Sequence, residues 1–212
     1  MITATAIKIY QEYNPKRNLK SPKTKVIKKA DKHNYAIRWF NPKRFKDILA
    51  LITIDKQEIL FKKMLPKTPS KLSYYRDVLN SSTNHQFDNF YVFAICNYRN
   101  DVIGWIQYMP DENLNKLKKI IKIEAKALVL EVSYAKLFST NLKGVAVNGL
   151  KQTMDIVRKL DNNNYKDLYI SAYTDSKNIA SEYVLNTNRF EKLKSTIIYA
   201  NEPNNVWIRK LN

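Results

Sequence analysis

The chain is short of cysteine and histidine, and each shortage excludes a class of protein. Cys96 is the only cysteine in 212 residues, so no disulfide can form within the chain, and a reducing compartment is favoured. Cys96 lies in an apolar run, which favours a small core residue over a nucleophile. The two histidines, His33 and His85, lie in polar segments, which argues against a histidine-based catalytic triad. A zinc ligand set and a Gly-x-x-x-x-Gly-Lys-Ser/Thr phosphate loop are also missing, so we expect no metal site and no ATP site of that type.

Long hydrophobic runs are absent too. No stretch reaches the ~18 consecutive apolar residues that a membrane helix needs. Lys8, Gln11 and Glu12 interrupt the N-terminal segment where a signal peptide would have its apolar core. We therefore expect a cytoplasmic protein without a membrane partner. Apolar residues still make up 44% of the chain, which is enough for the core of one domain.

Acidic residues are scarce relative to basic ones. The chain has 19 Asp and Glu against 37 Lys and Arg, a net charge of +18, which attracts nucleic acids and other polyanions. A coding bias that enriches Lys, Asn, Ile and Tyr together explains many of the lysines equally well. Residues 1–34 hold nine Lys or Arg and two acids. With little apolar content in residues 14–34, we predict a flexible basic arm over 1–34 and a folded domain over 35–212, with residues 2–10 apolar enough to dock.

The order of predicted elements indicates a mixed α/β domain. The apolar run Ala127–Val132 predicts a central strand, and a helix separates it from the strand over 168–173, so these two strands should be parallel. The stripe Val147, Leu150, Met154 and Val157 predicts a helix packed on the sheet. Gly104 early in a strand predicts a bulge or a close backbone approach. The other expected strands cover 35–40, 90–98, 102–109, 196–200 and 206–209, and the expected helices cover 42–51, 55–64, 69–79, 146–160 and 178–186, with a loop over 80–89.

Glycine is rare as well, with only three in the chain, and Gly144 has the most informative position. It lies in a short loop after the central strand and just before the helical stripe. A glycine there lets backbone N–H groups at a helix N-terminus approach a phosphate. An ordinary tight strand-to-helix connection accounts for the same residues, and the loop alone leaves both readings open.

Three local patterns together resemble the GNAT acyl-CoA N-acyltransferase superfamily. Asn141-Leu142-Lys143-Gly144-Val145-Ala146 is similar to the family's pyrophosphate loop, (Gln/Arg)-x-x-Gly-x-(Gly/Ala), and Asn178-Ile179-Ala180-Ser181 is similar to its Asn-x-x-(Ala/Ser). Arg189-Phe190 then takes the place of the family's Gly-Phe. Departures are Asn141 at the leading loop position, Arg189 in place of the glycine, and Leu185 where the family often has tyrosine.

The resemblance implies a fold and a cosubstrate. The expected fold is a mostly antiparallel mixed sheet with a splayed central parallel pair and helices on both faces. Acetyl-CoA would place its pantetheine arm in the splay beside Val132 and its pyrophosphate on residues Asn141, Leu142, Lys143, Gly144, Val145 and Ala146, with Lys143 or Lys177 adding charge. Asn178 and Ser181 would contact the cofactor, although Asn178 also fits the role of a simple helix cap.

The resemblance also implies a chemistry. Glu131, in the apolar central strand, would be the general base, and Tyr183 or Tyr173 would protonate the leaving thiolate. Glu131 in a structural ion pair is the alternative. The implied function is an N-acetyltransferase with an unknown amine acceptor, and the basic arm favours a macromolecular dock such as nucleic acid or the ribosome. A catalytically weak GNAT-like nucleic-acid or ribosome-binding module is the alternative function.

Overall fold

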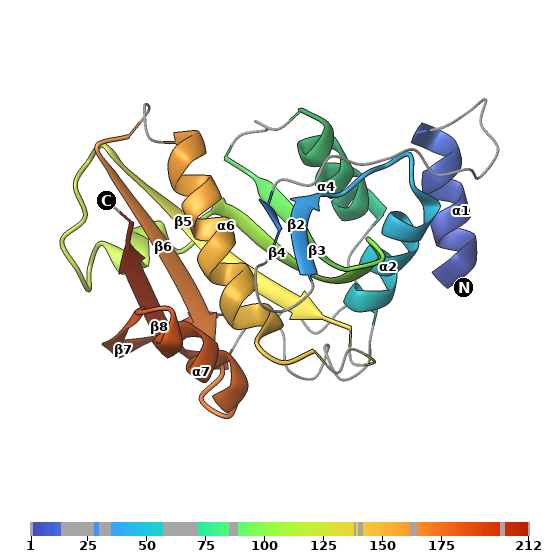
Figure 1. Cartoon of the computed structure of the whole chain (residues 1–212). Coiled ribbons are helices and arrows are strands. Elements are labelled where there is room, and N and C mark those ends of the chain that lie inside the picture. Colours follow the sequence, from blue (N-terminus) through green and yellow to red (C-terminus); the bar gives the residue numbers. More distant parts are fainter. Residues whose placement is uncertain are drawn as a thin grey trace. The chain divides into compact units, whose positions relative to one another are not determined.

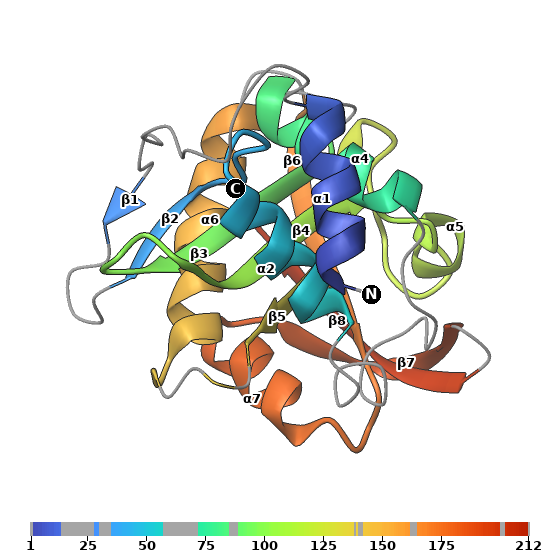
Figure 2. The ribbon, with the colours of Figure 1, turned by 90° about the vertical axis from the view of Figure 1, so that its right-hand side faces the viewer.

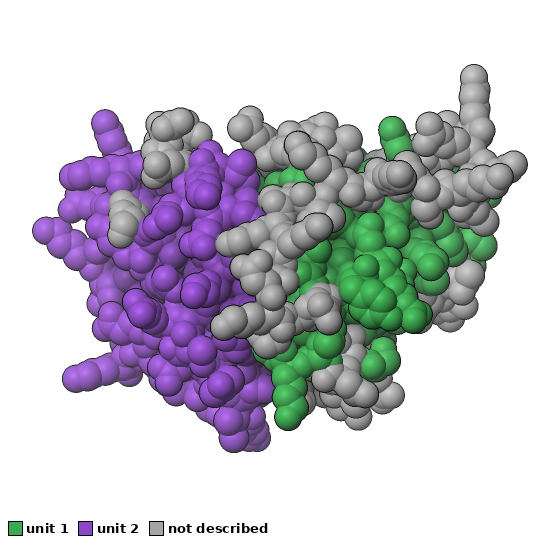
Figure 3. All heavy atoms as spheres, viewed as in Figure 1, with its two compact units in different colours: residues 1–107, 134–145 green, residues 108–133, 146–212 purple. Residues whose placement is uncertain are grey.

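The structure of the chain is a computed structural model. It describes residues 2–13, 28–29, 35–56, 72–84, 89–137, 139, 142–161, 165–199 and 202–211. The chain divides into two compact units (Figure 3), a first unit of residues 1–107 and 134–145 and a second unit of residues 108–133 and 146–212.

Eight strands of the described residues form one sheet in the order β1-β2-β3-β4-β5-β6-β8-β7. The pairs β1–β2, β2–β3, β6–β8 and β7–β8 are antiparallel, whereas β5 and β6 are parallel. This mixed, mostly antiparallel sheet with one central parallel pair confirms the predicted fold class. The strands are β1 (Lys28–Lys29), β2 (Tyr35–Trp39), β3 (Tyr91–Asn97), β4 (Val102–Pro110), β5 (Ala127–Lys136), β6 (Asp167–Thr174), β7 (Glu191–Tyr199) and β8 (Glu202–Lys210).

Helices α1 (Ile2–Tyr13), α2 (Phe45–Asp55) and α4 (Leu72–Asn84) belong to the first unit. Helix α2 confirms the helix predicted over 42–51 and buries an apolar face that includes Ile48, Leu51 and Ile52. Helix α4 continues to Asn84, so the loop predicted from residue 80 was wrong for its first five residues. Polar residues lower helix propensity by only a few tenths of a kcal/mol each, so a helix anchored by buried side chains can continue through them. Most of the helix predicted over 55–64 lies outside the described residues.

Helix α1 contains residues 2–10, the part of the expected arm that was predicted to be apolar enough to dock. Ala6, Ile9 and Tyr10 are buried in the same apolar cluster as the inner face of α2, and α1 lies beside α2 in both ribbon views (Figures 1 and 2). Arg76 of α4 forms an ion pair with Glu12, 2.8 Å between Nη2 and Oε1. Residues 2–13 are therefore part of the first unit, and most of the remaining arm lies outside the described residues.

A buried ion pair fixes β2 to the start of α2. The side chains of Arg38 and Asp47 are 0% and 1% exposed and form a bidentate pair. Arg38 Nε also donates to Asn100 Oδ1 at 2.8 Å, in the β3–β4 turn. Burial opposes the charge on Arg38, but the hydrogen bond and charge of Asp47 hold the pKa of the guanidinium above its ordinary value. Cys96 lies nearby and is fully buried, and burial raises the pKa of its thiol to about 12, as expected for a core residue.

Gly104 is a point of close backbone approach. A Cβ at this position would lie 2.7 Å from the carbonyl oxygen of Ala135 on β5. Only glycine fits that distance, so the sequence-based expectation for Gly104 is confirmed.

In the second unit, helix α6 (Val145–Asp161, of which all but Val145 belongs to this unit) runs along β5 and β6 (Figure 1). Three of the four residues of its predicted stripe, Leu150, Met154 and Val157, are buried, whereas Val147 is partly exposed. The short helix α5 (Leu114–Leu117) forms part of the connection from β4 to β5, and helix α7 (Ile179–Thr187) joins β6 to β7. The closing hairpin is confirmed but longer than predicted, since β7 and β8 extend over nine residues each.

Candidate functional site

The parallel pair β5–β6 separates partway along its length. Its register runs from Ala127 opposite Asp167 to Glu131 opposite Ser171. Beyond this point β5 continues to Lys136 and β6 continues to Thr174, with β6 now paired to β8 only. A strand that leaves its partner presents backbone N–H and C=O groups that need other partners. The splay predicted for the central pair therefore begins at Glu131 and Ser171.

Four polar residues gather where the register ends, all of them in the second unit. Glu131 lies on β5, Ser171 and Tyr173 lie on the same side of β6, and Asp111 follows directly after β4. The Tyr173 hydroxyl donates to Asp111 Oδ2 at 2.8 Å, and the Ser171 hydroxyl donates to the same oxygen. We call Asp111, Ser171, Tyr173 and Glu131 the β6 cluster.

Charge and burial act together on the tyrosine of the β6 cluster. Burial raises the pKa of the Tyr173 hydroxyl, and the negative charges of Asp111 and Glu131 raise it further. The phenol therefore stays protonated, and its proton is directed at Asp111. Tyr173 itself is half-buried, whereas Asp111 and Glu131 are each 7% exposed.

Asp111 accepts hydrogen bonds on both of its carboxylate oxygens. The backbone N–H of Asn113 donates to Oδ1 at 2.6 Å, while the two hydroxyls of the β6 cluster donate to Oδ2. Among the residues that the structure describes, no Lys, Arg or His forms an ion pair with Asp111.

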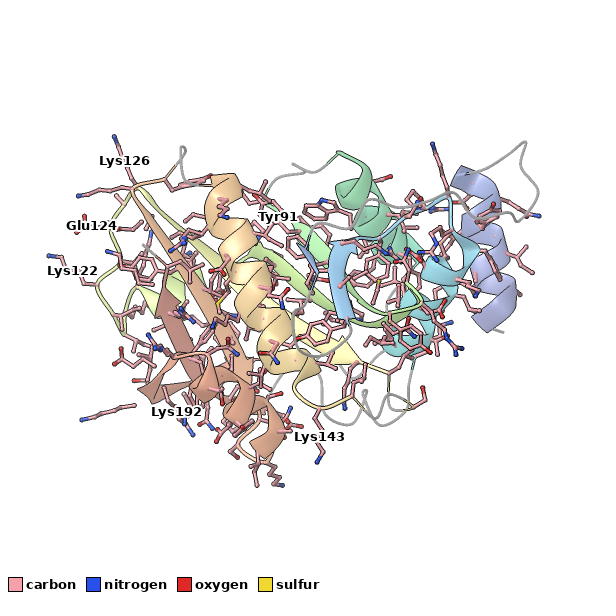
Figure 4. The ribbon with its side chains drawn as sticks, viewed as in Figure 1. Tyr91, Lys122, Glu124, Lys126, Lys143 and Lys192 are labelled. Carbon is pink, nitrogen blue, oxygen red and sulfur yellow. The ribbon has the colours of Figure 1, made fainter. Side chains whose placement is uncertain are left out.

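The predicted phosphate loop leads directly into helix α6. Gly144 has φ 73°, in the left-handed region that favours glycine, so the residue type is needed for the turn itself. Val145 begins the helix and is buried, and the first N–H groups of any helix lack intrahelical acceptors. Lys143 is exposed and its side chain points away from the ribbon (Figure 4). Leu142 and Ala146 are partly exposed on either side of this turn, and Asn141 lies outside the described residues.

Helix α7 carries the second predicted motif. Asn178 is its N-cap, because the side-chain oxygen accepts a hydrogen bond from the Ser181 backbone N–H at 3.3 Å. The alternative interpretation of Asn178 as a cap is thereby confirmed, and contact of Asn178 or Ser181 with a cofactor stays a prediction. Tyr183 is 67% exposed on this helix, and Leu185 is fully buried.

The end of helix α7 accounts for one departure from the resembling family. Arg189 has φ 58°, so an arginine adopts the left-handed conformation in which the family pattern places glycine. The backbone N–H of Phe190 closes the helix end on the Leu185 carbonyl at 3.1 Å. Asn188 donates to the Val147 carbonyl at 3.1 Å and so ties this helix end to the first turns of α6.

Sequence reasoning singles out Glu131 and Tyr173 but misses Asp111 and Ser171. Asp111 falls between the strands predicted over 102–109 and 127–132, and it lies 60 residues from Ser171 in the sequence. No periodicity connects residues at such a separation. The position directly after β4 is the only available signal, and it needs knowledge of which strands are neighbours.

The described residues show no other class of site. They contain no group of three or more His, Cys, Asp or Glu arranged to hold a metal ion. None of the helices within the described ranges is long and apolar enough to cross a membrane.

Comparison with known proteins finds matches among solved structures only. No protein-family model matches the chain, and no curated protein matches it. Solved structures do match. The Vibrio fischeri ribosomal-protein-S5-alanine acetyltransferase has a TM-score of 0.60 at 17% identity, covering 85% of this chain and 94% of that one. RimL, the ribosomal L7/L12 alpha-N-protein acetyltransferase in complex with coenzyme A, has a TM-score of 0.60 at 16% identity, covering 87% and 97%.

A third matching structure was solved with acetyl-CoA bound. The microcin C7 self immunity acetyltransferase MccE, in complex with acetyl-CoA and AMP, has a TM-score of 0.56 at 15% identity, covering 84% of this chain and 93% of that one. At sequence identities of 15% to 17%, structural similarity shows that the proteins share a fold. The chain has the fold of the GNAT acetyltransferases, as its three motifs predicted.

Proposed function

We propose that the protein is an acetyl-CoA-dependent N-acetyltransferase. The observation that supports this most strongly is the splay of β5 and β6 beside the β6 cluster, since the register ends at Glu131 and Ser171 while both strands continue. Acyl transfer needs a cofactor arm held in a fixed place and a group that accepts protons from the amine. The fold shared with acetyltransferases that contain CoA or acetyl-CoA supports the same reaction.

Several residues would hold the cofactor. The backbone N–H groups of residues 142–146 would bind the pyrophosphate, because a helix N-terminus favours an anion and Gly144 keeps the main chain accessible. The backbone of β5 from Val132 onward, no longer paired with β6, would hydrogen-bond the pantetheine arm. Acetyl-CoA supplies the activated thioester, whose carbonyl carbon accepts the amine nitrogen. Asn141, Asn178 and Ser181 stay candidates for further contacts.

Different residues would act as the general base and as the general acid. Glu131 is the proposed general base that converts the incoming ammonium to a neutral amine. The Tyr173 hydroxyl donates to Asp111, so its proton is not available to the leaving thiolate. Tyr183 is therefore the better candidate for the acid, because it is exposed and no described residue hydrogen-bonds its hydroxyl.

The acceptor would be an amine, and the charge of the protein limits the kind of molecule that can carry it. A protein with net charge +18 repels a free polycation, but Glu131 and Asp111 give the β6 cluster a local negative potential that attracts one ammonium group. We infer an amine carried by an anionic macromolecule, such as a ribosomal particle. The net positive charge of the protein would attract the macromolecule, while the negative charges of the β6 cluster would attract its ammonium group.

The test is release of free thiol from acetyl-CoA in the presence of candidate acceptors. A suitable panel contains a peptide with a free N-terminus, a peptide with an internal lysine, a polyamine and purified ribosomes. Glu131→Gln should lower kcat by roughly 10²–10⁴ with acetyl-CoA binding retained. Thiol release that no amine accelerates would contradict the proposal. Unchanged turnover in Glu131→Gln would remove only Glu131 from the mechanism.

A further inference from the structure

We propose that Tyr173 and Asp111 form a second proton acceptor, separate from Glu131, which removes the proton that the amine loses after it attacks the thioester. The inference rests on the proposed function and deepens it. Tyr173 is the catalytic residue, because it would touch the acceptor nitrogen. Asp111 is a positioning residue that acts through Tyr173.

The chemistry requires two proton losses at the nitrogen. An alkyl ammonium must lose one proton before it can attack, and the nitrogen must lose another before the amide is complete. A carboxylate that has accepted the first proton cannot accept the second until it has released the first to solvent. The β6 cluster contains two carboxylates, Glu131 and Asp111, and the charge of each acts on the same phenol.

The geometry decides which role Tyr173 can have. Its hydroxyl donates to Asp111 Oδ2 at 2.8 Å, so toward an incoming N–H group the phenol oxygen can act only as an acceptor. Both oxygens of Asp111 already accept hydrogen bonds, Oδ1 from the Asn113 N–H and Oδ2 from the Ser171 and Tyr173 hydroxyls. Tyr173 is half-buried and Asp111 is buried, so the phenol is the more accessible of the two groups. A proton leaving the nitrogen would therefore reach Asp111 through Tyr173.

The surroundings of Asp111 fit a proton acceptor. The Ser171 and Tyr173 hydroxyls and the Asn113 N–H all donate to its carboxylate, and no cation of the described residues pairs with it. A buried carboxylate without a cation is costly to keep, and hydrogen bonds offset only part of that cost. The positive charge that forms transiently on the acceptor nitrogen would stabilise the Asp111 carboxylate during the reaction.

Protons and charges balance over the step. The neutral amine nitrogen bonds to the thioester carbonyl carbon, which leaves the nitrogen positively charged and its remaining protons acidic. One of these protons moves to the Tyr173 oxygen while the Tyr173 hydroxyl proton moves to Asp111. The C–S bond then breaks, CoA leaves as a thiolate that takes up a proton, and Asp111 returns its proton to solvent through Tyr173.

A structural role for Asp111 is the rival interpretation, because Asp111 also begins the turn before α5. The Asn113 N–H donates to Oδ1, and the Leu114 N–H donates to the Asp111 carbonyl at 3.2 Å. Asp111→Asn keeps an oxygen for the Asn113 N–H and so retains the turn. It replaces the oxygen that faces Tyr173 with a donor that cannot accept the phenol proton. The substitution therefore separates the two roles.

The experiment measures kcat and KM against pH for the wild type, Asp111→Asn, Tyr173→Phe, the double variant and Glu131→Gln, with the best amine of the panel. The charged groups that act on the Tyr173 hydroxyl are Asp111, from the turn after β4, and Glu131, from β5. Tyr169→Phe is the matched control, since Tyr169 is a tyrosine on the same strand outside the β6 cluster. Thermal unfolding and acetyl-CoA binding check that each variant is folded.

We expect Asp111→Asn and Tyr173→Phe each to lower kcat roughly 10²-fold with little change in KM for acetyl-CoA, and the double variant to be no worse than either. Raising the pH toward the pKa of the amine should restore Glu131→Gln, because solution then supplies the neutral amine. It should not restore Asp111→Asn or Tyr173→Phe, since the second proton must still leave.

Three outcomes would overturn the inference. Wild-type kcat in a folded Asp111→Asn or Tyr173→Phe variant would do so, and so would recovery of these variants at high pH in parallel with Glu131→Gln. If Asp111→Asn fails to fold, Tyr173→Phe decides alone, because it keeps the ring and the turn. A wild type that binds no acetyl-CoA and acetylates no amine refutes the proposed function itself, and the inference fails with it.

Discussion

Arg189→Gly should stabilise the protein, and the structure gives the size of the effect. Arg189 has φ 58°, a conformation that costs a residue with a Cβ about 1–2 kcal/mol. Glycine removes this cost but adds about 0.5–1 kcal/mol of chain entropy to the unfolded state. The substitution also removes a like charge near Arg209, whose pKa is lowered by burial and then by the charge of Arg189. From these opposing effects the net gain should be about 0.5–1 kcal/mol.

Thermal unfolding followed by circular dichroism measures this gain. For a chain of this size, about 1 kcal/mol raises Tm by roughly 2–4 °C. Arg189→Ala is the matched control, because it removes the charge but keeps a Cβ in the left-handed region. Glycine should therefore exceed alanine by most of the expected gain. Equal Tm values for the two variants would show that backbone strain at Arg189 is not what limits stability.

Four further predictions concern the first unit. Asp47→Ala should cost about 3–5 kcal/mol, measured by urea unfolding, because it leaves the Arg38 guanidinium buried without its carboxylate; a loss below about 1 kcal/mol would contradict this. Gly104→Ala should cost about 1–3 kcal/mol by the same measurement, since its Cβ would meet a backbone carbonyl at 2.7 Å, and a neutral effect would mean that β5 moves freely. Deleting residues 1–13 should lower Tm by several degrees, because it removes the buried Ala6, Ile9 and Tyr10, and an unchanged Tm would restore the view of a detachable arm. Cys96, with its pKa raised to about 12, should react with a thiol reagent at about pH 8 only after unfolding, and rapid labelling of the native protein would contradict its burial.

Local patterns predict what depends on local physics. The stripe of α6 is visible in the sequence because helical periodicity places Leu150, Met154 and Val157 on one face. The left-handed turn at Gly144 was predictable because a glycine between a strand and a helix, in a chain with so few, indicates a position where a Cβ is not tolerated. The parallel pair followed from the order of strand, helix and strand, since such connections have a fixed hand.

Features that depend on distant residues could not be predicted in the same way. The apolar content of residues 2–10 indicated that they could dock, but not where, because the apolar face of α2 lies beyond a basic segment that dominates the composition of residues 1–34. The contact between Asp111 and Tyr173 exists only because the turn after β4 lies over the end of β6. Propensity and spacing carry no information about either contact.

Titration of the wild-type protein with acetyl-CoA, by calorimetry and by thermal unfolding, measures whether the proposed cosubstrate binds. Ligand at about a hundred times its Kd should add about 2.7 kcal/mol and raise Tm by roughly 5–10 °C. Gly144→Val should abolish this rise, because its side chain blocks the approach to the main chain and strains the turn at φ 73°. Lys122→Ala, at an exposed position, should leave binding intact (Figure 4). Absence of any heat or Tm shift at millimolar acetyl-CoA in the folded wild type would contradict the account.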